Sequence, residues 1–202
     1  MTKHRHYGAR MRWGLLFGDM EAQLEEALRL DRESSAAELE RAEFARVLFL
    51  ERLRGAEARV VTLDVPGAGR LDGVVRRVGA DWLILEGGTS DWLVPARSIR
   101  WASGLMRSAG SEDDAIWGRL GMASALRTVA RDRSMVQVFL EPEGPDPLVL
   151  SGVIARVGAD FLELWDVTPG SEGGRRQSVA AVPFGAVRAV RSGSGPGTFR
   201  EL

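Results

Sequence analysis

The chain has 202 residues, of which 45% are hydrophobic and 27% are charged, as in a globular protein with room for one ordinary domain or two small ones. Its formal net charge is −1, so the molecule as a whole does not attract phosphate backbones or anionic membranes, and nucleic-acid binding would need a local basic patch. It has no cysteine, which excludes disulfides and thiolate metal sites, and no apolar run approaches the roughly 20 residues of a membrane span, so we expect a cytoplasmic protein.

The N-terminal quarter of the chain carries a helical pattern. Residues 1–12 are expected to be a flexible tail, in which Met11 is an alternative candidate for the native start. Residues 13–55 form the predicted helical segment, because apolar residues recur there at three-and-four spacing. The two apolar seams consist of Phe17, Met20, Leu24 and Leu28, followed by Leu39, Ala42, Phe49 and Leu53.

Polar residues interrupt this pattern between the two seams. Asp31 and Ser35 stand where a continuous stripe needs apolar side chains. Two interpretations stay open: two helices with a break near Asp31–Ser35, or one long helix with a weak middle. If a helix restarts there, Ser34 or Ser35 would cap it and Glu38 would complete a capping box. Gly55 is predicted to end the segment.

The rest of the chain repeats itself. The phrase "GVVRRVGADWLILE" begins at Gly73, and "GVIARVGADFLELW" begins at Gly152, 79 residues later. The pair Val-Pro at 94–95 recurs at 182–183, now 88 residues later, so 9 extra residues fall in the glycine-rich loop between them. Insertions are tolerated best in loops, so this pattern predicts a tandem duplication.

Each copy reads as five short strands joined by tight turns, which is typical of a small antiparallel barrel. The fold class we predict is mainly β with helices: two tandem five-stranded, SH3-like antiparallel barrels, each preceded by a helix. The predicted strands span 59–65, 70–78, 82–86, 92–95 and 99–102 in the first copy, and 135–141, 148–157, 161–167, 179–183 and 187–192 in the second. The predicted parts are therefore the tail 1–12, the helical segment 13–55, barrel one at 56–107, a linker and helix at 108–134, barrel two at 135–192, and a tail at 193–202.

The helix between the copies is predicted over 115–132. Its apolar positions are Ile116, Leu120, Ala123, Leu126 and Ala130, at helical spacing. Two glycines, Gly118 and Gly121, weaken it.

The repeated phrase itself is predicted to be a hairpin. Gly79 and Gly158 are expected to supply the positive φ of a tight turn, and Asp81 and Asp160 to accept hydrogen bonds from the turn backbone. Alternation along the third strand places one set of side chains inside the barrel and the other set on the opposite face. The inside set is Leu83, Leu85, Leu162 and Leu164, and the opposite set is Trp82, Ile84, Glu86, Phe161, Glu163 and Trp165. Gly73 and Gly152 are expected to permit sharp bends that close each barrel.

The order "VVTL", "GRLDGVV", "VGADWLILE" and "VPARSIRWA" resembles the Sm/LSm family, which includes the bacterial Hfq proteins. The resemblance implies bent five-stranded SH3-like barrels with an N-terminal helix, many of which bind RNA as rings. The family's base-contacting asparagine has no counterpart after Asp81 or Asp160, so no RNA contact is carried over. The opening "MRWGLLFGDMEAQLEEA" also resembles the start of an uncharacterised actinobacterial family in which a helical N-terminus precedes such barrels.

Arginines interleaved with tryptophans are the main candidate site, because charge and stacking together hold single-stranded nucleic acid. Local ion pairing on an ordinary surface is the alternative. The candidate nucleic-acid-binding residues are Arg76, Arg77, Arg97, Arg100, Trp82, Trp92, Arg156, Arg175, Arg176 and Arg188; Arg70, Arg191 and Trp101 lie in the same units.

Other constellations point away from catalysis. The only histidines, His4 and His6, sit in the predicted tail, so neither a zinc site nor a Ser-His triad is expected. Asp113 and Asp114 are expected to cap the next helix, and the glycine-rich loop at 173–178 lacks the context of a nucleotide-binding loop. We expect no catalytic residue, metal or cofactor.

Two functions follow as hypotheses. The first is a non-catalytic adaptor or assembly protein, in which segment 13–55 binds a protein partner or a second copy. The alternative is an RNA-binding or other nucleic-acid-binding regulator that uses the arginine and tryptophan faces.

Overall fold

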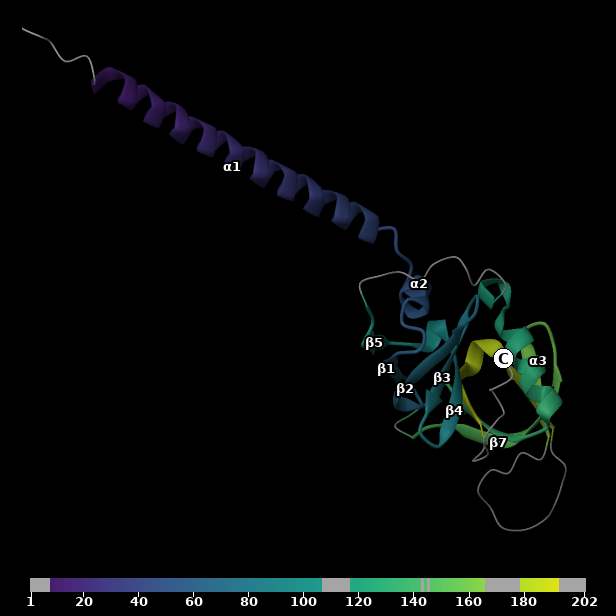
Figure 1. Ribbon diagram of the computed structural model, residues 1–202. Helices are drawn as coiled ribbons and strands as arrows, with labels where there is room; N and C mark the ends of the chain where they lie inside the picture. The colour runs from purple at the N-terminus through teal and green to yellow at the C-terminus, as the bar shows by residue number, and fades with distance from the viewer. Residues whose placement is uncertain (1–7, 107–116, 143, 145, 166–178, 193–202) are drawn as a thin grey trace, which may run out of the picture. The chain divides into compact units, whose positions relative to one another are not determined.

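The structure is a computed structural model, and it describes residues 8–106, 117–142, 144, 146–165 and 179–192 (Figure 1). Side chains in the first helix are described from Met20 onward, Ala22 excepted. The chain divides into two units, Met1–Val47 and Leu48–Leu202. None of the described helices combines the length and hydrophobicity needed to cross a bilayer.

The first unit contains one uninterrupted helix, α1, from Gly8 to Phe44. Of the two interpretations of the N-terminal pattern, the single long helix is therefore confirmed. The predicted capping box is wrong, because Ser34 and Ser35 lie inside the helix. Charged pairs support this middle region: Arg29 reaches Glu26 at 2.6 Å and Glu33 at 2.8 Å, the spacings at which helix neighbours meet.

A second, short helix, α2, spans Phe49–Arg54 in the larger unit. The Glu51 carboxylate accepts the Leu48 backbone N–H at 2.7 Å, which satisfies one of the free donors at this helix start. Gly55 follows the last helical residue, as predicted. The predicted second seam is divided, since Leu39 lies in α1 and Leu53 in α2.

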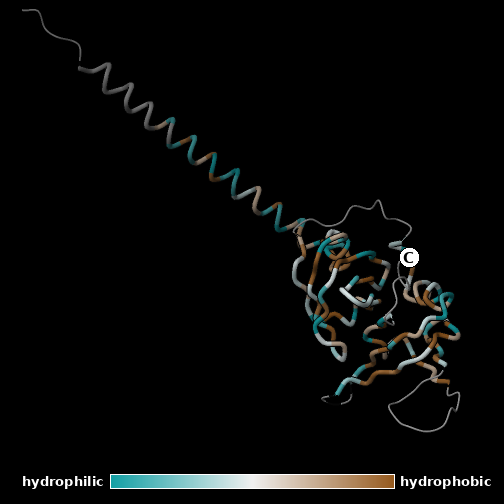
Figure 2. Tube along the Cα trace, turned by 60° about the horizontal axis from the view of Figure 1, so that its bottom comes forward, coloured by the Kyte–Doolittle hydropathy of each residue, from teal (hydrophilic) through white to brown (hydrophobic). Residues whose placement is uncertain are grey.

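The larger unit is built on one antiparallel sheet of ten strands, in the order β5-β1-β2-β3-β4-β10-β6-β7-β8-β9. The chain is thus mainly β with helices, as predicted. In Figure 2, hydrophobic residues are coloured brown along the tube of this unit. The first half comprises β1 (Val60–Val65), β2 (Gly69–Val78), β3 (Trp82–Gly87), β4 (Ser90–Pro95), the turn η1 (Ala96–Ser98) and β5 (Trp101–Ser103). The second half comprises η3 (Trp117–Arg119), α3 (Met122–Asp132), β6 (Met135–Leu140), β7 (Val149–Val157), β8 (Phe161–Trp165), β9 (Val179–Pro183), η4 (Phe184–Ala186) and β10 (Val187–Ser192).

The two halves have the same strand order and register. In each half the last strand pairs with the first, and the first four strands follow in sequence. Val74 pairs with Glu86 in the first half, and Val153, 79 residues later, pairs with Trp165 in the second. The register shifts after Val75 in one half and after Ile154 in the other. Because even this irregularity repeats, the halves are structural copies.

The halves are joined edge to edge. β4 of the first half pairs with β10 of the second, with Leu93 opposite Val190 and Trp92 opposite Arg191. We call this pairing, together with the contacts of residues 117–132 on the first half, the junction. The ends of the continuous sheet are then β5 and β9.

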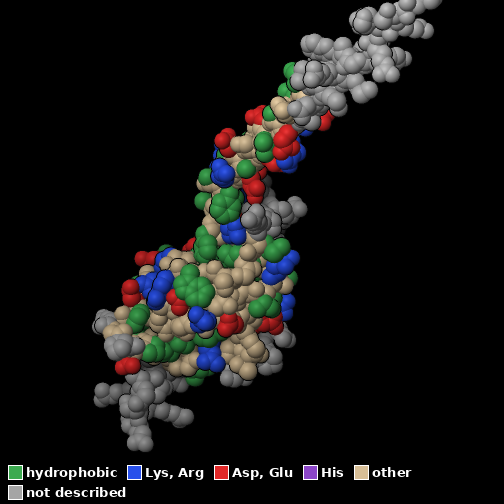
Figure 3. All heavy atoms as spheres, turned by 90° about the vertical axis from the view of Figure 1, so that its left-hand side faces the viewer, with side chains coloured by type: hydrophobic (Ala, Val, Ile, Leu, Met, Phe, Trp, Pro, Cys, Tyr) green, Lys and Arg blue, Asp and Glu red, His purple; other side chains and the backbone are tan. Residues whose placement is uncertain are grey.

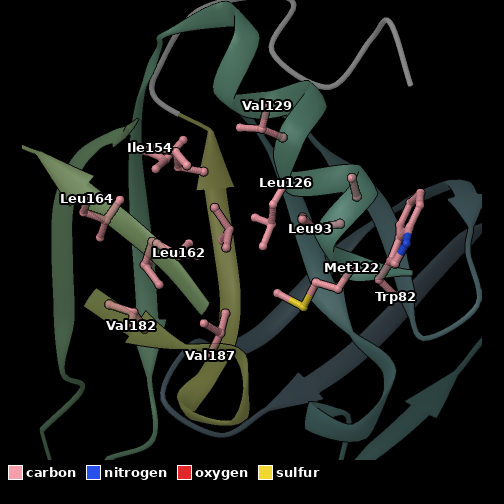
Figure 4. Close-up of a cluster of buried hydrophobic side chains, with 14 of the residues drawn as sticks. Trp82, Leu93, Met122, Leu126, Val129, Ile154, Leu162, Leu164, Val182 and Val187 are labelled. Atoms are coloured by element: carbon pink, nitrogen blue, oxygen red, sulfur yellow. The ribbon is translucent and has the colours of Figure 1, made fainter. Parts of the chain in front are cut away.

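Two buried clusters lie on opposite faces of β3. Leu83 and Leu85 belong to the cluster of the first half, as predicted. Trp82 and Ile84, which were predicted to lie on the face opposite the barrel interior, are buried in a second cluster with α3 and the second half. Figure 4 shows α3 between the strands of the two halves in this cluster, with Trp82, Leu93, Met122, Leu126, Val129, Ile154, Leu162, Leu164, Val182 and Val187 labelled.

The helix α3 is shorter than predicted, because it begins only after Gly121. The predicted apolar seam is confirmed in part: Leu126 is buried, and Leu120 and Ala130 pack against the same cluster, but the other buried residues of α3 are Met122, Ala125 and Val129. The preceding residues form the separate turn η3, as two closely spaced glycines disfavour a continuous helix. Ile116 lies outside the described residues.

The glycines of the repeated hairpin act differently from the prediction. Neither Gly79 nor Gly158 has a positive φ. Among the described glycines, Gly67, Gly69 and Gly104 have a positive φ. A Cβ at Gly79 would instead overlap the Trp82 ring, and one at Gly158 would overlap the Phe161 ring. These positions therefore require glycine because an aromatic ring occupies the space of a side chain.

Gly73 and Gly152 also mark close approaches. A Cβ at Gly73 would overlap the Glu86 carbonyl on β3, and a Cβ at Gly152 would overlap the Trp165 carbonyl on β8. Glycine at these positions lets the neighbouring strand approach closely.

Candidate binding surfaces

Most of the predicted arginines in the first half contact local partners. Arg76 forms an ion pair with Glu86, and Arg100 forms one with Asp64 at 3.3 Å. Arg77 lies over the Trp117 ring at 5.3 Å. Arg97 donates to the Phe184 carbonyl and, at 3.3 Å, to the Val187 carbonyl. Arg97 is therefore part of the junction.

The arginines of the second half behave similarly. Arg156 pairs with Glu163 at 3.2 Å, and Arg188 pairs with Glu141 at 2.5 Å. Arg191 donates to the Ser90 hydroxyl at 3.0 Å and stacks over Trp92 at 5.5 Å, so it also holds the junction. The remaining candidates of this half, Arg175 and Arg176, lie outside the described residues.

The two candidate tryptophans pack against other residues of the chain. Trp82 is fully buried, and its Nε1 donates to the Leu120 carbonyl at 2.8 Å, so its ring presents no open face to a base. Trp92 is half-buried between Arg191 and Phe139, whose ring centroid lies 5.3 Å away. Trp101 is covered on one side by Arg70 at 5.3 Å.

A basic groove lies between α3 and β7, with a volume of about 460 Å³. Arg127, Arg131 and Arg133 line it from the helix side, and Arg156 and Trp165 line it from the strands. No acidic residue is among its lining residues. Of this set, only Arg156 was among the binding residues predicted from the sequence. The spacing of Arg127 and Arg131 along one helix face was visible, but their approach to β7 depends on the fold.

The helix α1 presents large apolar side chains to solvent along its described length. Figure 3 shows them interleaved with acidic and basic side chains. The exposed apolar residues are Met20, Leu24, Leu28, Leu30, Leu39 and Phe44. Exposed large apolar residues in this number on one element are typical of a partner-binding surface.

The outer face of β8 and β9 exposes apolar side chains on either side of Glu163, which forms an ion pair with Arg156. Phe161 is 36% exposed, Trp165 is 50% exposed and Val179 is 57% exposed. On the equivalent face of the first half, Trp82 and Leu93 are completely buried under α3 and the second half. The same face of the repeated unit is thus covered in one half and open in the other.

The aspartates of the hairpins hold other elements rather than their own turns. The Asp81 carboxylate accepts the Met122 N–H at 2.8 Å and so caps α3, which corrects the predicted role. The Asp160 backbone carbonyl accepts the Phe184 N–H at 2.7 Å, and among the described residues its carboxylate has no hydrogen-bond partner. The capping contact of Asp81 therefore has no counterpart in the described part of the second half.

No cluster of three or more histidine or acidic side chains able to hold a metal occurs within the described residues. The other sequence candidates, His4, His6, Asp113, Asp114 and the loop 173–178, lie outside them. Comparisons of the chain with family models, with curated proteins and with solved structures found no match.

Proposed function

We propose that this protein is a non-catalytic assembly module, in which α1 binds another protein chain and the duplicated sheet is the body that carries it. One observation supports this most directly: α1 spans 37 residues and exposes six large apolar side chains. Neither of the two buried clusters described in the larger unit includes a residue of α1, so these exposed residues are available for a partner.

The placement of the arginines supports the same proposal. Arg76, Arg100, Arg156 and Arg188 each pair with a carboxylate, which reduces the local positive charge that phosphate binding needs. Arg97 and Arg191 hydrogen-bond across the junction and contribute to holding the two halves together. These arginines therefore serve the scaffold.

The proposal includes a finer description of the fold, in which each five-stranded half is a small bent barrel of the Sm-like type. The repeated strand order, register and irregularity support this description. So do the close approaches at Gly73 and Gly152, because strongly bent sheets need such positions.

The test is affinity purification from the native cell with the wild-type chain and with the double substitution Leu24→Glu, Leu28→Glu as baits. Both side chains are exposed, so the substitutions leave the helix able to form while replacing two of its six exposed large apolar side chains by charges. Ser34→Glu, Ser35→Glu is the matched control, since it adds the same charge at exposed polar positions of α1.

We expect defined protein partners to be recovered with the wild-type and control baits, with or without nuclease, and to be lost with the Leu24→Glu, Leu28→Glu bait. Equal recovery with all three baits, or loss of every partner on nuclease treatment, would contradict the assembly function.

A second candidate function is binding of single-stranded RNA, favoured by the basic groove between α3 and β7. Arg127, Arg131 and Arg133, which form no ion pair among the described residues, and the half-exposed Trp165 combine the charge and the stacking platform that such binding uses. The test is fluorescence anisotropy of a labelled single-stranded RNA with Arg131→Glu, Arg133→Glu, against the control Arg46→Glu, Arg59→Glu.

If the groove binds RNA, the groove variant weakens binding by more than about tenfold and the control does not, and the wild-type affinity falls steeply with salt. Equal weakening by both variants, or no binding at low salt, would exclude this second function.

A further inference from the structure

We infer that the exposed face of the second half binds a second copy of this chain, head to tail, by repeating the internal junction between different molecules. The inference rests on the proposed assembly function and specifies one of its partners. It concerns a surface distinct from α1.

The internal junction supplies the geometry. The hairpin after β2 binds the segment that leads into α3. The Ala80 N–H and the Trp82 Nε1 both donate to the Leu120 carbonyl, at 3.0 Å and 2.8 Å. The Asp81 carboxylate accepts the Met122 N–H. Next to this contact, β4 pairs with β10. The first half is thereby completed by an edge strand and by a helix start that come from the second half.

The second half offers the same acceptor surface without an occupant among the described residues. We call it the rear surface: Asp160, Phe161, Trp165, Val179 and Ala181. By the repeat, Asp160 corresponds to Asp81, Phe161 to Trp82, and Ala181 to Leu93. At the position of the buried Ile84 this surface has Glu163, whose charge is paired with Arg156 at 3.2 Å. β9 pairs only with β8 among the described strands and carries no charged side chain, so it lacks a common protection of edge strands against pairing.

The first half offers the matching donor surface. We call it the front surface: Leu48, Phe49 and the strand β5. β5 corresponds to β10, since Trp101 and Ala102 pair with β1 as Ala189 and Val190 pair with β6. β5 pairs with no other described strand, so its second edge is open.

The helix α2 corresponds to α3 in its contacts as well as in its place in the chain. Arg54 of α2 donates to the Gly79 carbonyl at 3.0 Å, and Arg127 of α3 donates to the Gly158 carbonyl at 3.3 Å. The same alignment places Phe49 at the position of Met122. Met122 is 2% exposed in the junction, whereas Phe49 is 43% exposed and Leu48 is 65% exposed.

The two surfaces fit chemically. In the complex, Phe49 and Leu48 of one copy cover Phe161 and Trp165 of the next, as Met122 and its neighbours cover Trp82 internally. The Asp160 carboxylate, which has no hydrogen-bond partner among the described residues, accepts the Phe49 N–H as Asp81 accepts the Met122 N–H. β5 and β9 extend the sheet, with small side chains at Ala102, Ser103, Ala180 and Ala181 along the new pairing.

The contact between copies is weaker than the internal junction. The internal contact includes hydrogen bonds from Arg97 and Ser98 to the Val187 carbonyl, each at 3.3 Å, and Gly185 and Ala186 at the equivalent positions cannot make them. Assembly should therefore depend on concentration. Because front and rear are different surfaces, the interface is heterologous and produces rings or open chains rather than a symmetric dimer.

The test uses the full chain with Leu24→Glu, Leu28→Glu, which weakens contacts through α1. On this background we introduce Phe49→Glu at the front or Ala181→Arg at the rear, and Leu148→Glu or Thr89→Arg as exposed controls. Sedimentation velocity over a wide concentration range measures assembly, and circular dichroism checks that each variant keeps its fold.

We expect the background protein and both controls to assemble as concentration rises, and each front or rear variant alone to require more than about tenfold higher concentration. An equimolar mixture of the front and rear variants should form a dimer and nothing larger, because one intact rear then meets one intact front. A background protein that stays monomeric, or variants that assemble like the controls, would overturn the inference. The proposed function would survive that result if α1 still captured its partner.

Discussion

At Gly79 and Gly158, the missing side chain makes room for an aromatic ring. The ring of Trp82 or Phe161, three residues further on, occupies the space in which a Cβ would lie. The cost of adding a methyl group therefore depends on whether the ring can move. Trp82 is completely buried and hydrogen-bonded, whereas Phe161 is more than a third exposed.

We expect Gly79→Ala to lower the free energy of unfolding by about 1–3 kcal/mol, because the added methyl group displaces a buried ring. Gly158→Ala should cost clearly less, since Phe161 can turn toward solvent. Gly88→Ala is the control, as nothing lies within 4 Å of a Cβ there. Urea unfolding measures the free energy of unfolding of all three variants. An equal loss of stability in Gly79→Ala and Gly158→Ala would show that the mobility of the ring does not determine the destabilisation.

At the scale of elements, α3 starts where a side chain from another strand caps it. The Asp81 carboxylate accepts the first helical N–H, and this contact crosses from the first half to the second. We expect Asp81→Ala to reduce stability by about 0.5–2 kcal/mol through loss of the cap. Asp160→Ala should leave thermal stability unchanged and weaken assembly only, since its carboxylate has no described partner within one chain. A comparable loss of stability in both variants would be evidence against this distinction.

The strands were predictable because their signals are local. Period-two alternation and turn residues predict β1 through β10 in place, and the repeated phrase predicts that the halves fold alike. The burial of both faces of β3 was not predictable, because "WLILE" is apolar on both faces and does not reveal which neighbour covers Trp82. The start of α3 and the groove around Arg156 depend on contacts between distant segments, which periodicity does not record.

At the scale of the whole molecule, the larger unit has one sheet and a core to which both halves contribute. The cluster around α3 joins Trp82, Ile84 and Leu93 of the first half to Leu162 and Leu164 of the second. The duplicated halves therefore depend on each other for burial. A single copy of the repeat would leave Trp82 and Ile84 in water.

This shared core predicts that the two halves unfold together. Met122→Ala removes a buried side chain from the cluster and should cost about 2–5 kcal/mol. Although Met122 belongs to the second half, we expect the slowest-exchanging amides of β2 and β3 to lose protection as much as those of β7 and β8, by more than about tenfold. Hydrogen exchange followed by mass spectrometry makes the comparison, with the exposed Met135→Ala as control. Faster exchange confined to β7 and β8 would mean that the halves are independent folding units, joined by an edge but not by a common core.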